Sequence, residues 1–253
     1  MSKIRHHAIH WIRRAASSLG YAINSIPNLD DPDLVAFLMS RNVDLVLDVG
    51  ANMGQFGIDL RRYGYTGEIL SFEPVAEMFT TLSSKVVADG KWSARELALG
   101  AQYGWTEINV TENTCFSSLL PQTVAAQMFD DQTRIVRREK VQVRPLDAFF
   151  DEFRDRNVFL KIDTQGFEHQ VLEGAPRTLS ILKGIQLEVP IVQLYENAWG
   201  LPEISSYLGN RGFALSQIRP VAYRGDDPVS LLEVDCIFGA VNDQISSTPW
   251  HAR

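Results

Sequence analysis

The chain has 253 residues, of which 45% are hydrophobic, so it is long enough to bury the core of one large globular domain. Its net charge of −7, from 24 basic and 31 acidic residues, argues against a protein whose main task is gripping nucleic acid, because neutralising phosphates requires clustered Lys and Arg. The two cysteines, Cys115 and Cys236, show no CxxC or Cys/His spacing, so we expect a cytoplasmic protein without a disulfide framework or a structural zinc site.

Residues 1–40 are expected to form an N-terminal helical extension. The opening "MSKIRHHAIHWIRRAASSLGYAI" is positively charged but lacks an apolar stretch long enough for a signal peptide or a membrane span, so we expect no stable membrane insertion. Apolar residues recur in it at helical spacing, which predicts a short amphipathic helix. That helix would pack on the body of the protein, on a second subunit of a homodimer, or against a membrane surface or glycolipid; disorder is the remaining alternative.

Strands and helices alternate along the rest of the chain. The predicted helices span residues 34–42, 54–63, 75–88, 145–153, 168–181 and 202–210. The predicted strands span residues 44–49, 68–73, 94–99, about 105–110, 140–144, 158–163, 184–189, 213–218 and 231–239. Residues 111–138 read as irregular or mixed, and their length suggests a lid or an acceptor wall.

This alternation predicts an α/β, Rossmann-like fold. Strands separated by helices need crossover connections, and hence a mainly parallel sheet with helices on both faces. The last two strands are separated only by "VAYRGDDPVS", which is too short for a helical crossover, so they should pair antiparallel. We expect one domain over residues 41–242, with a flexible tail at 243–253.

The stretch "VLDVGANMGQFG" looks like a strand that opens into a helix through a glycine turn. The dinucleotide fingerprint needs a glycine where Asn52 stands, and no Gly-Lys-Ser/Thr follows to make a P-loop. Asp48 at the entrance of the turn disfavours a phosphate. A ligand with an amino group and a sulfonium centre, S-adenosylmethionine, fits this turn better.

Glu73 ends the predicted strand 68–73, where a carboxylate can accept hydrogen bonds from both ribose hydroxyls of such a ligand. It follows Gly50 by about 20 positions, the separation expected for this acid in NAD sites as well. The missing middle glycine favours S-adenosylmethionine over NAD. Glu73 is alternatively a helix N-cap that precedes Pro74.

Several stretches together resemble FkbM-type methyltransferases, a family of S-adenosylmethionine-dependent O-methyltransferases of natural-product and glycolipid pathways. They are "VLDVGANMGQFG", "ILSFEP", "ALG", "SSL", "VRPLDAFF", "VFLKIDTQGFEHQVLEGA" and "GIQLEV", in the family's order from about residue 43 to 240. The resemblance implies a class I methyltransferase fold. It also implies methyl transfer to a hydroxyl of a sugar, glycolipid or natural product, hence a small-molecule or glycoside acceptor and no nucleic acid.

The resemblance also implies a set of cofactor-binding residues. The methionine end would lie against Asp48, Gly50, Ala51, Asn52 and Gly54, the ribose against Glu73 beside Pro74, and the adenine among Phe72, Leu97 and Ala98. The family stretch K-I-D-x-E-G-x-E appears as residues 161–168, with Gln165 in place of the common glutamate. Any role that needs a carboxylate at position 165 is therefore in doubt.

Candidate catalytic residues lie at the ends of two neighbouring predicted strands. Lys161 and Asp163 share a face of strand 158–163, and Asp163 falls at the carboxyl edge, where it would also contact the cofactor. Glu188 lies at the end of the next strand. The two carboxylates would serve as a base and a positioning group, or would share a divalent cation such as Mg²⁺. Lys161 is either catalytic or a structural lysine that pairs with Asp163 or Glu188.

Three further groups have two interpretations each. His169 is the best-located histidine for general base catalysis, or an ordinary helix-surface residue. Ser117 and Ser118 hydrogen-bond the cofactor or the acceptor, or cap a turn. The stretch "QLYENAWG" offers Tyr195, Glu196, Asn197 and Trp199, which suit sugar binding, although packing explains Trp199 equally well.

Two functions from other classes remain open at this point. One is a Rossmann-type NAD-dependent oxidoreductase, which the glycine turn and Glu73 alone do not exclude. The other is a non-catalytic scaffold with a degenerate cofactor pocket, for which Gln165 is the only sign.

Overall fold

The computed structural model describes residues 32–129, 133–224, 227 and 229–241 of the chain. These residues belong to a compact unit that begins at Pro32. The predicted amphipathic helix before residue 32 and the predicted tail at 243–253 lie outside the described residues.

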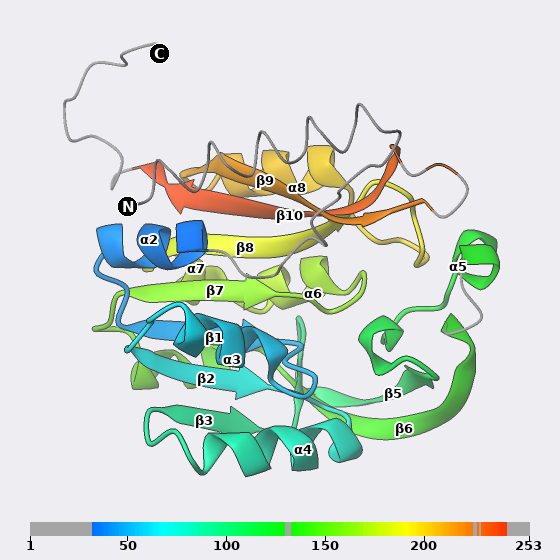
Figure 1. The fold of residues 1–253 in the computed structure, drawn as a ribbon, viewed down its shortest axis with the longest axis horizontal. Helices are drawn as coiled ribbons and strands as arrows, with labels where there is room; N and C mark the ends of the chain where they lie inside the picture. The colour runs from blue at the N-terminus through cyan, green and yellow to red at the C-terminus, as the bar shows by residue number, and fades with distance from the viewer. Residues whose placement is uncertain (1–31, 130–132, 225–226, 228, 242–253) are drawn as a thin grey trace, which may run out of the picture. The chain divides into compact units, whose positions relative to one another are not determined.

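Seven strands form one mainly parallel sheet (Figure 1). In spatial order they are β3 (Trp92–Arg95), β2 (Glu68–Phe72), β1 (Leu45–Val49), β7 (Val158–Ile162), β8 (Leu182–Pro190), β10 (Leu231–Ala240) and β9 (Phe213–Tyr223). The first five run parallel, whereas β10 is antiparallel to both β8 and β9. The predicted α/β fold with a C-terminal antiparallel hairpin is therefore confirmed.

Helices cover both faces of this sheet (Figure 1). One face carries α2 (Pro32–Ser40), α3 (Gln55–Arg62) and α4 (Ala76–Val86). The other carries the 3₁₀ helix η3 (Leu146–Glu152), α6 (Glu168–Glu173), α7 (Pro176–Leu179) and α8 (Leu201–Gly209). Alternate residues of β1 enter the two layers: Val46 faces the α2 side, while Leu45 and Leu47 face the η3 side. This alternation is the period-2 pattern of a strand buried on both faces.

Helix α2 packs within the same unit as the sheet, although it falls in the predicted extension. The ring of Phe37 lies 5.8 Å from that of Phe159 on β7, in an edge-to-face arrangement. A Cβ atom on Gly184 of β8 would come within 2.7 Å of the Phe37 ring. Helix α2 therefore packs on the sheet, although the domain boundary was predicted after it, at residue 40.

A second, three-stranded sheet was not predicted. It consists of β4 (Ala98–Leu99), β6 (Ile135–Arg144) and β5 (Gly104–Thr111), with β6 in the centre. The predicted strand 94–99 is split between the two sheets, because Leu97 N donates to Arg95 O at 3.1 Å and this tight turn redirects the chain. The inner face of the second sheet packs on Val75 and Met78 at the start of α4.

Other predicted boundaries differ from those observed. Residues 111–138 contain the 3₁₀ helix η1 (Thr114–Phe116), helix α5 (Val124–Phe129) and the first residues of β6. The predicted helix 168–181 is two helices, because Pro176 starts a new one and Gly174 approaches the Gly100 carbonyl oxygen too closely for a side chain. Strand β9 extends five residues further than the predicted end at residue 218.

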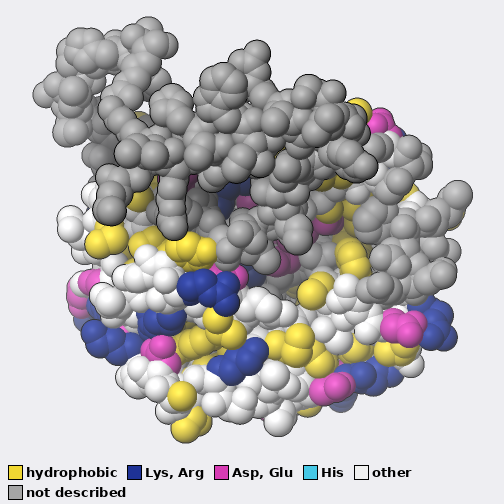
Figure 2. All heavy atoms as spheres, in the orientation of Figure 1, with side chains coloured by type: hydrophobic (Ala, Val, Ile, Leu, Met, Phe, Trp, Pro, Cys, Tyr) yellow, Lys and Arg dark blue, Asp and Glu magenta, His cyan; other side chains and the backbone are white. Residues whose placement is uncertain are grey.

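The described residues contain no helix long and apolar enough to cross a membrane. Figure 2 shows the face that carries α3 and α4. On its described part, Lys and Arg side chains are scattered among acidic and apolar ones and form no continuous basic stripe.

Candidate functional site

The carboxyl ends of the parallel strands bring the predicted site residues to one edge of the sheet (Figure 1). The glycine turn follows β1, Glu73 follows β2, and Asp163 follows β7. Segment 111–120, which includes η1, lies at the same edge, because Asn52 Nδ2 donates to Thr114 Oγ1 at 3.2 Å. The site is thus formed by the main sheet and by segment 111–120, which precedes β6, the central strand of the second sheet.

The glycine turn after β1 has a backbone that few residues other than glycine can adopt. Gly50 has a φ of 76°, and a Cβ atom there would lie 1.8 Å from the carbonyl oxygen of Asp163. Asn52 has a φ of 48°, a left-handed conformation that asparagine tolerates better than most side chains. Its Oδ1 accepts from Met53 N at 2.8 Å, so the side chain stabilises the turn in which it lies.

Glu73 joins this turn to helix α4. Its Oε2 accepts from Asn52 N at 2.7 Å, and its Oε1 accepts from Val75 N at 2.9 Å. The N-cap of α4 is Val75 and not Glu73, so Glu73 is not the N-cap that its alternative interpretation predicts. Burial raises the pKa of Glu73 to about 7, although the two backbone hydrogen bonds act in the opposite direction. A buried carboxylate that is held from both sides thus lies beside the turn.

The side chain of Asp48 is fully buried, which differs from the predicted contact with the methionine end. Ser71 Oγ donates to Asp48 Oδ2 at 3.0 Å and itself accepts from Trp92 Nε1 at 2.9 Å. Lys161 Nζ lies 3.3 Å from Asp48 Oδ1. In this structure Asp48 therefore acts on the site through Lys161 and through its charge, which raises the pKa of Glu73.

Phe72, which was predicted among the residues around the adenine, has its side chain in the core. Its ring is 1% exposed and packs in the core, 5.7 Å from the ring of Phe149. The carbonyl oxygen of Phe72 accepts instead from Gly50 N at 3.0 Å and from Ala51 N at 3.1 Å. Phe72 thus supports the turn through its backbone. Leu97 and Ala98, although 7% and 5% exposed, lie near this end of the sheet, and Pro74 is half-buried.

Lys161 pairs with carboxylates on both sides, as its structural interpretation predicts. Its Nζ lies 3.3 Å from Asp163 Oδ2 as well as 3.3 Å from Asp48 Oδ1, and it donates to Gly50 O at 3.4 Å. Burial acts to lower the pKa of Lys161, but the carboxylates of Asp163 and Asp48 hold that pKa above its usual value. Lys161 is therefore a fixed cation at neutral pH and not a general base.

Gln165 bridges the two carboxylates that were predicted to share a cation. Its Nε2 donates to Asp163 Oδ1 at 3.0 Å and to Glu188 Oε1 at 3.3 Å. Among the residues that the structure describes, no group of three His, Cys, Asp or Glu side chains is arranged to hold a metal ion. An amide N–H has no lone pair to offer a cation. The residues between Asp163 and Glu188 therefore do not fit the predicted Mg²⁺.

Two carboxylates on β10 extend the acidic group and were missed in the sequence. Glu233 and Asp235 are 6% and 9% exposed, and Asp235 lies opposite Glu188 in the strand register. Burial raises the pKa of Glu233 to about 7 and that of Asp235 to about 6. Burial, Asp163 and Glu233 raise the pKa of Glu188 well above its usual range, and Glu188 hydrogen-bonds Glu233. Glu233 and Asp235 could have been noticed in the sequence, because both acids interrupt the apolar run "LLEVDCIFGAV".

The turn that carries Gln165 is held in place by three side chains. Glu168 Oε1 accepts from Thr164 N at 2.9 Å and from Gly166 N at 3.2 Å, and burial raises the pKa of Glu168 to about 6. Ser118 Oγ donates to the carbonyl oxygen of Gln165 at 2.6 Å. Tyr195 OH lies 3.0 Å from Gln165 Oε1 and 2.9 Å from the Phe116 carbonyl oxygen. Ser118 and Tyr195 thus fasten segment 111–120 to this turn.

The remaining candidates make local contacts. Ser117 Oγ accepts from Thr111 N at 3.2 Å, as in a turn. The ring of His169 stacks on that of Trp199 at 3.5 Å, and its Nε2 lies 3.1 Å from Glu173 Oε1 one helical turn away. These contacts favour the interpretation of His169 as a helix-surface residue and of Trp199 as a packing residue. Glu196 and Asn197 are exposed.

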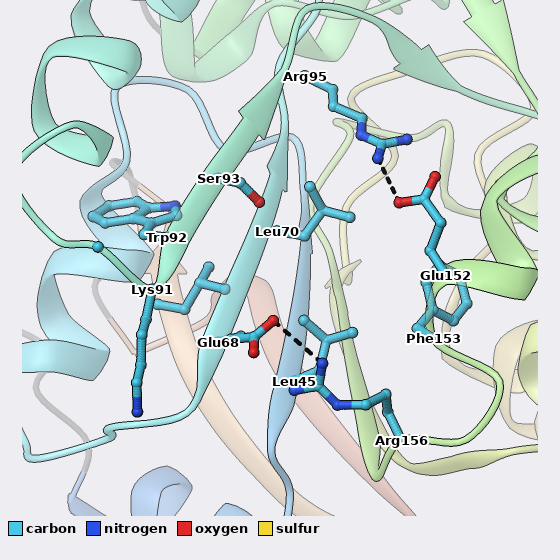
Figure 3. Close-up of a pocket in the computed structure, with 12 residues that line it drawn as sticks. Leu45, Glu68, Leu70, Lys91, Trp92, Ser93, Arg95, Glu152, Phe153 and Arg156 are labelled. Carbon is cyan, nitrogen blue, oxygen red and sulfur yellow. Dashed lines mark hydrogen bonds and ion pairs between the residues drawn. The ribbon is translucent and has the colours of Figure 1, made fainter.

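A separate pocket of about 260 Å³ lies along β2 and β3 (Figure 3). None of the candidate site residues lines it. Four of its five charged side chains form ion pairs, Arg95 with Glu152 at 2.5 Å and Arg156 with Glu68 at 3.2 Å, while Lys91 donates to the Thr66 carbonyl oxygen at 3.3 Å. A charged ligand would have to break these ion pairs, so the edge formed by the strand ends is the stronger candidate site.

Comparisons with known proteins find similar chains. Residues 48–215 match the family model described as the methyltransferase FkbM domain. The methyltransferase sdnD of Sordaria araneosa is 22% identical over 199 residues, which cover 69% of this chain and 75% of that protein.

Similar solved structures include a putative S-adenosylmethionine dependent methyltransferase from Listeria monocytogenes. It has a TM-score of 0.47 and 9% identity, and the match covers 84% of this chain and 98% of that one. The putative tRNA (m1A22) methyltransferase Sp1610 of Streptococcus pneumoniae, in complex with S-adenosyl-L-methionine, has a TM-score of 0.47 and 14% identity. That match covers 83% of this chain and 71% of that one.

Proposed function

This chain belongs to the FkbM methyltransferase family, and we propose that it transfers a methyl group from S-adenosylmethionine to a hydroxyl of a sugar, glycolipid or natural product. The resemblance stated from the sequence is thereby confirmed at the level of the family. The choice of a hydroxyl acceptor is the proposal.

The observation that carries the cofactor assignment is the pairing of the glycine turn with Glu73. Gly50 approaches the Asp163 carbonyl oxygen too closely for a side chain, and the buried Glu73 carboxylate is fixed by Asn52 N and Val75 N. Each carboxylate oxygen has a second lone pair with which to accept from a ribose hydroxyl. Glu73 and Asp163 also make this edge negative, which suits a sulfonium and an ammonium group better than a phosphate.

When bound, S-adenosylmethionine supplies a methyl group on a positively charged sulfur. The protein must align the acceptor oxygen with that carbon and receive the hydroxyl proton. Asp163 is suited to this task, because its side chain is 30% exposed while Lys161 and Gln165 hold its two oxygens. In our proposal the hydroxyl proton passes to Asp163. Burial and Asp163 raise the pKa of Glu188 well above its usual range.

Transfer of a labelled methyl group tests this proposal. The wild-type protein is incubated with methyl-labelled S-adenosylmethionine and separate sets of sugar, glycolipid and polyketide alcohols, with matched O-blocked compounds as controls. We expect label in at least one hydroxyl-bearing set, none in its O-blocked counterpart, and at least a tenfold loss with Asp163→Asn. Transfer to amines in place of hydroxyls would contradict the proposal.

A further inference from the structure

The amide of Gln165 uses its complete hydrogen-bonding capacity within the site. Its two N–H groups are directed at Asp163 Oδ1, 3.0 Å away, and at Glu188 Oε1, 3.3 Å away, while its Oε1 lies 3.0 Å from Tyr195 OH. A primary amide has two N–H donors and one oxygen acceptor, so each has a partner here. Carboxylate oxygens only accept, so they hold the N–H end of the amide, whereas the single proton of Tyr195 OH is donated either to Gln165 Oε1 or to the Phe116 carbonyl oxygen.

The backbone at Gln165 places that amide between the two strand ends. Gln165 has a φ of 55°, in the left-handed region that is costly for most side chains. The conformation is held from both sides, since Ser118 Oγ donates to the Gln165 carbonyl oxygen and Glu168 accepts from the flanking N–H groups of Thr164 and Gly166. A strained residue that is held by several neighbours is characteristic of a functional position.

Asp163 and Glu188 have hydrogen-bond and ion-pair partners within the protein, so no cation is needed between them. Lys161 lies 3.3 Å from Asp163 Oδ2, so the two Asp163 oxygens are held by Lys161 and Gln165 respectively. A divalent cation at this position would need oxygen lone pairs in place of the amide N–H groups.

We propose that Gln165 is a positioning residue that takes the place of a divalent cation between Asp163 and Glu188. The proposal rests on the proposed methyl transfer, for which it fixes the orientation of Asp163. The same amide, through Tyr195, ties segment 111–120 to the catalytic edge.

The substitution Gln165→Glu removes both donors and adds a third carboxylate in the same place. Carboxylate oxygens are the ligands that Mg²⁺ and Mn²⁺ prefer, and a cation is the simplest way to relieve repulsion among residues 163, 165 and 188. The substituted site should therefore bind a divalent cation that the wild-type site does not.

The experiment is a calorimetric titration with MnCl₂ of the full-length wild type, Gln165→Glu and Gln193→Glu. Gln193 is exposed, and its substitution introduces the same charge outside the site. S-adenosylhomocysteine is titrated into each protein separately, which tests the proposed function and the folding of each variant independently of Mn²⁺. We expect Gln165→Glu to bind Mn²⁺ at least tenfold more tightly than the wild type, Gln193→Glu to behave like the wild type, and Gln165→Glu/Asp163→Asn to lose the gain.

Two results would overturn the proposal. One is a wild-type protein that binds Mn²⁺ saturably and loses this binding with Asp163→Asn. The other is a folded Gln165→Glu variant with no gain in Mn²⁺ affinity. The first result needs no Gln165 variant, so the proposal can be contradicted even where Gln165→Glu does not fold.

Discussion

Gly50 combines an unusual backbone conformation with a neighbour that excludes any side chain. Gly90 provides a matched comparison, because its φ of 72° is close to the 76° of Gly50 but a Cβ atom there would have nothing within 4 Å. Gly90→Ala should cost only the left-handed strain, about 1–2 kcal/mol of unfolding free energy. Gly50→Ala adds the collision with Asp163 O and should cost roughly 4 kcal/mol or more. Urea denaturation measures both, and equal losses would contradict the steric account.

Glu73 is the residue on which the cofactor assignment depends most. Replacing it with Gln leaves a ribose hydroxyl poorly paired, which costs about 1–3 kcal/mol, or about 5- to 150-fold in affinity for S-adenosylhomocysteine. Glu77→Gln is the control, since Glu77 lies in the first turn of α4, just after Glu73, but is exposed and pairs with Arg137 at the surface. Calorimetry measures both variants. An unchanged affinity in Glu73→Gln would remove Glu73 from the site.

The raised pKa of Glu73 gives this affinity a pH dependence. In the proposed site the ionised carboxylate accepts from both ribose hydroxyls, and its pKa of about 7 means that it gains a proton as the pH falls from 8 to 6. Affinity of the wild type for S-adenosylhomocysteine should therefore fall over that range. In Glu73→Gln this component of the dependence should be absent, and an identical slope in both proteins would count against the assignment.

At the residue scale, strand ends were easier to predict than side-chain directions. Glu73 and Asp163 were placed correctly at the edge of the sheet, because each follows a recognisable apolar strand. Asp48 and Phe72 also lie at strand ends, but their side chains enter the buried layers above and below the sheet. Gln165 was noticed only as a departure from the family pattern, since its three partners come from segments far apart in the sequence.

At the scale of elements, the short helix α7 depends on a cap from another segment. Asp147, in η3, accepts from Arg177 N at 2.7 Å and from Thr178 N at 2.8 Å in the first turn of α7. Asp147→Ala should therefore cost about 1–2 kcal/mol of unfolding free energy. Asp151→Ala serves as the control, because the Asp151 side chain is 74% exposed and makes only surface ion pairs. Urea denaturation that gives equal losses for the two variants would contradict the capping role.

The elements of the main sheet could be predicted because each has its own local pattern. Strands β1, β2 and β7 are apolar runs, and the helices between them have apolar faces at helical spacing. The second sheet could not be predicted in this way. Strand β4 has only two residues, and β6 is rich in charge because one of its faces is exposed. The pairing of β6 with β5 joins residues that are more than 20 positions apart in the sequence, and local patterns do not indicate such pairs.

At the scale of the whole molecule, buried carboxylates make stability depend on pH. Burial raises the pKa of five of them above the usual range: Glu73, Glu168, Glu188, Glu233 and Asp235. Between pH 6 and pH 8 the native state therefore binds more protons than the unfolded state, so the free energy of unfolding decreases as pH rises. We expect the thermal unfolding midpoint to be higher at pH 6 than at pH 8.

Glu233→Gln tests the origin of this dependence, because it removes one of the titrating groups while it keeps the shape of the side chain. The difference between the midpoints at pH 6 and pH 8 should shrink in this variant. Stability that increases from pH 6 to pH 8 in the wild type would contradict the account of the acidic group.

The order of motifs along the chain predicts the fold and the family. It does not predict the acceptor molecule. The family match ends at residue 215, so β10 with Glu233 and Asp235 lies beyond it. The acidic group at the strand ends is thus contributed partly by a strand that lies beyond the matched residues.

The central claim is that the glycine turn and Glu73 bind S-adenosylmethionine and not a dinucleotide. It is tested most directly by calorimetric titration of the wild-type protein with S-adenosylhomocysteine and, in parallel, with NADH. The account predicts saturable binding of S-adenosylhomocysteine, weakened at least tenfold by Glu73→Ala, and no binding of NADH. Binding of NADH without binding of S-adenosylhomocysteine would contradict it.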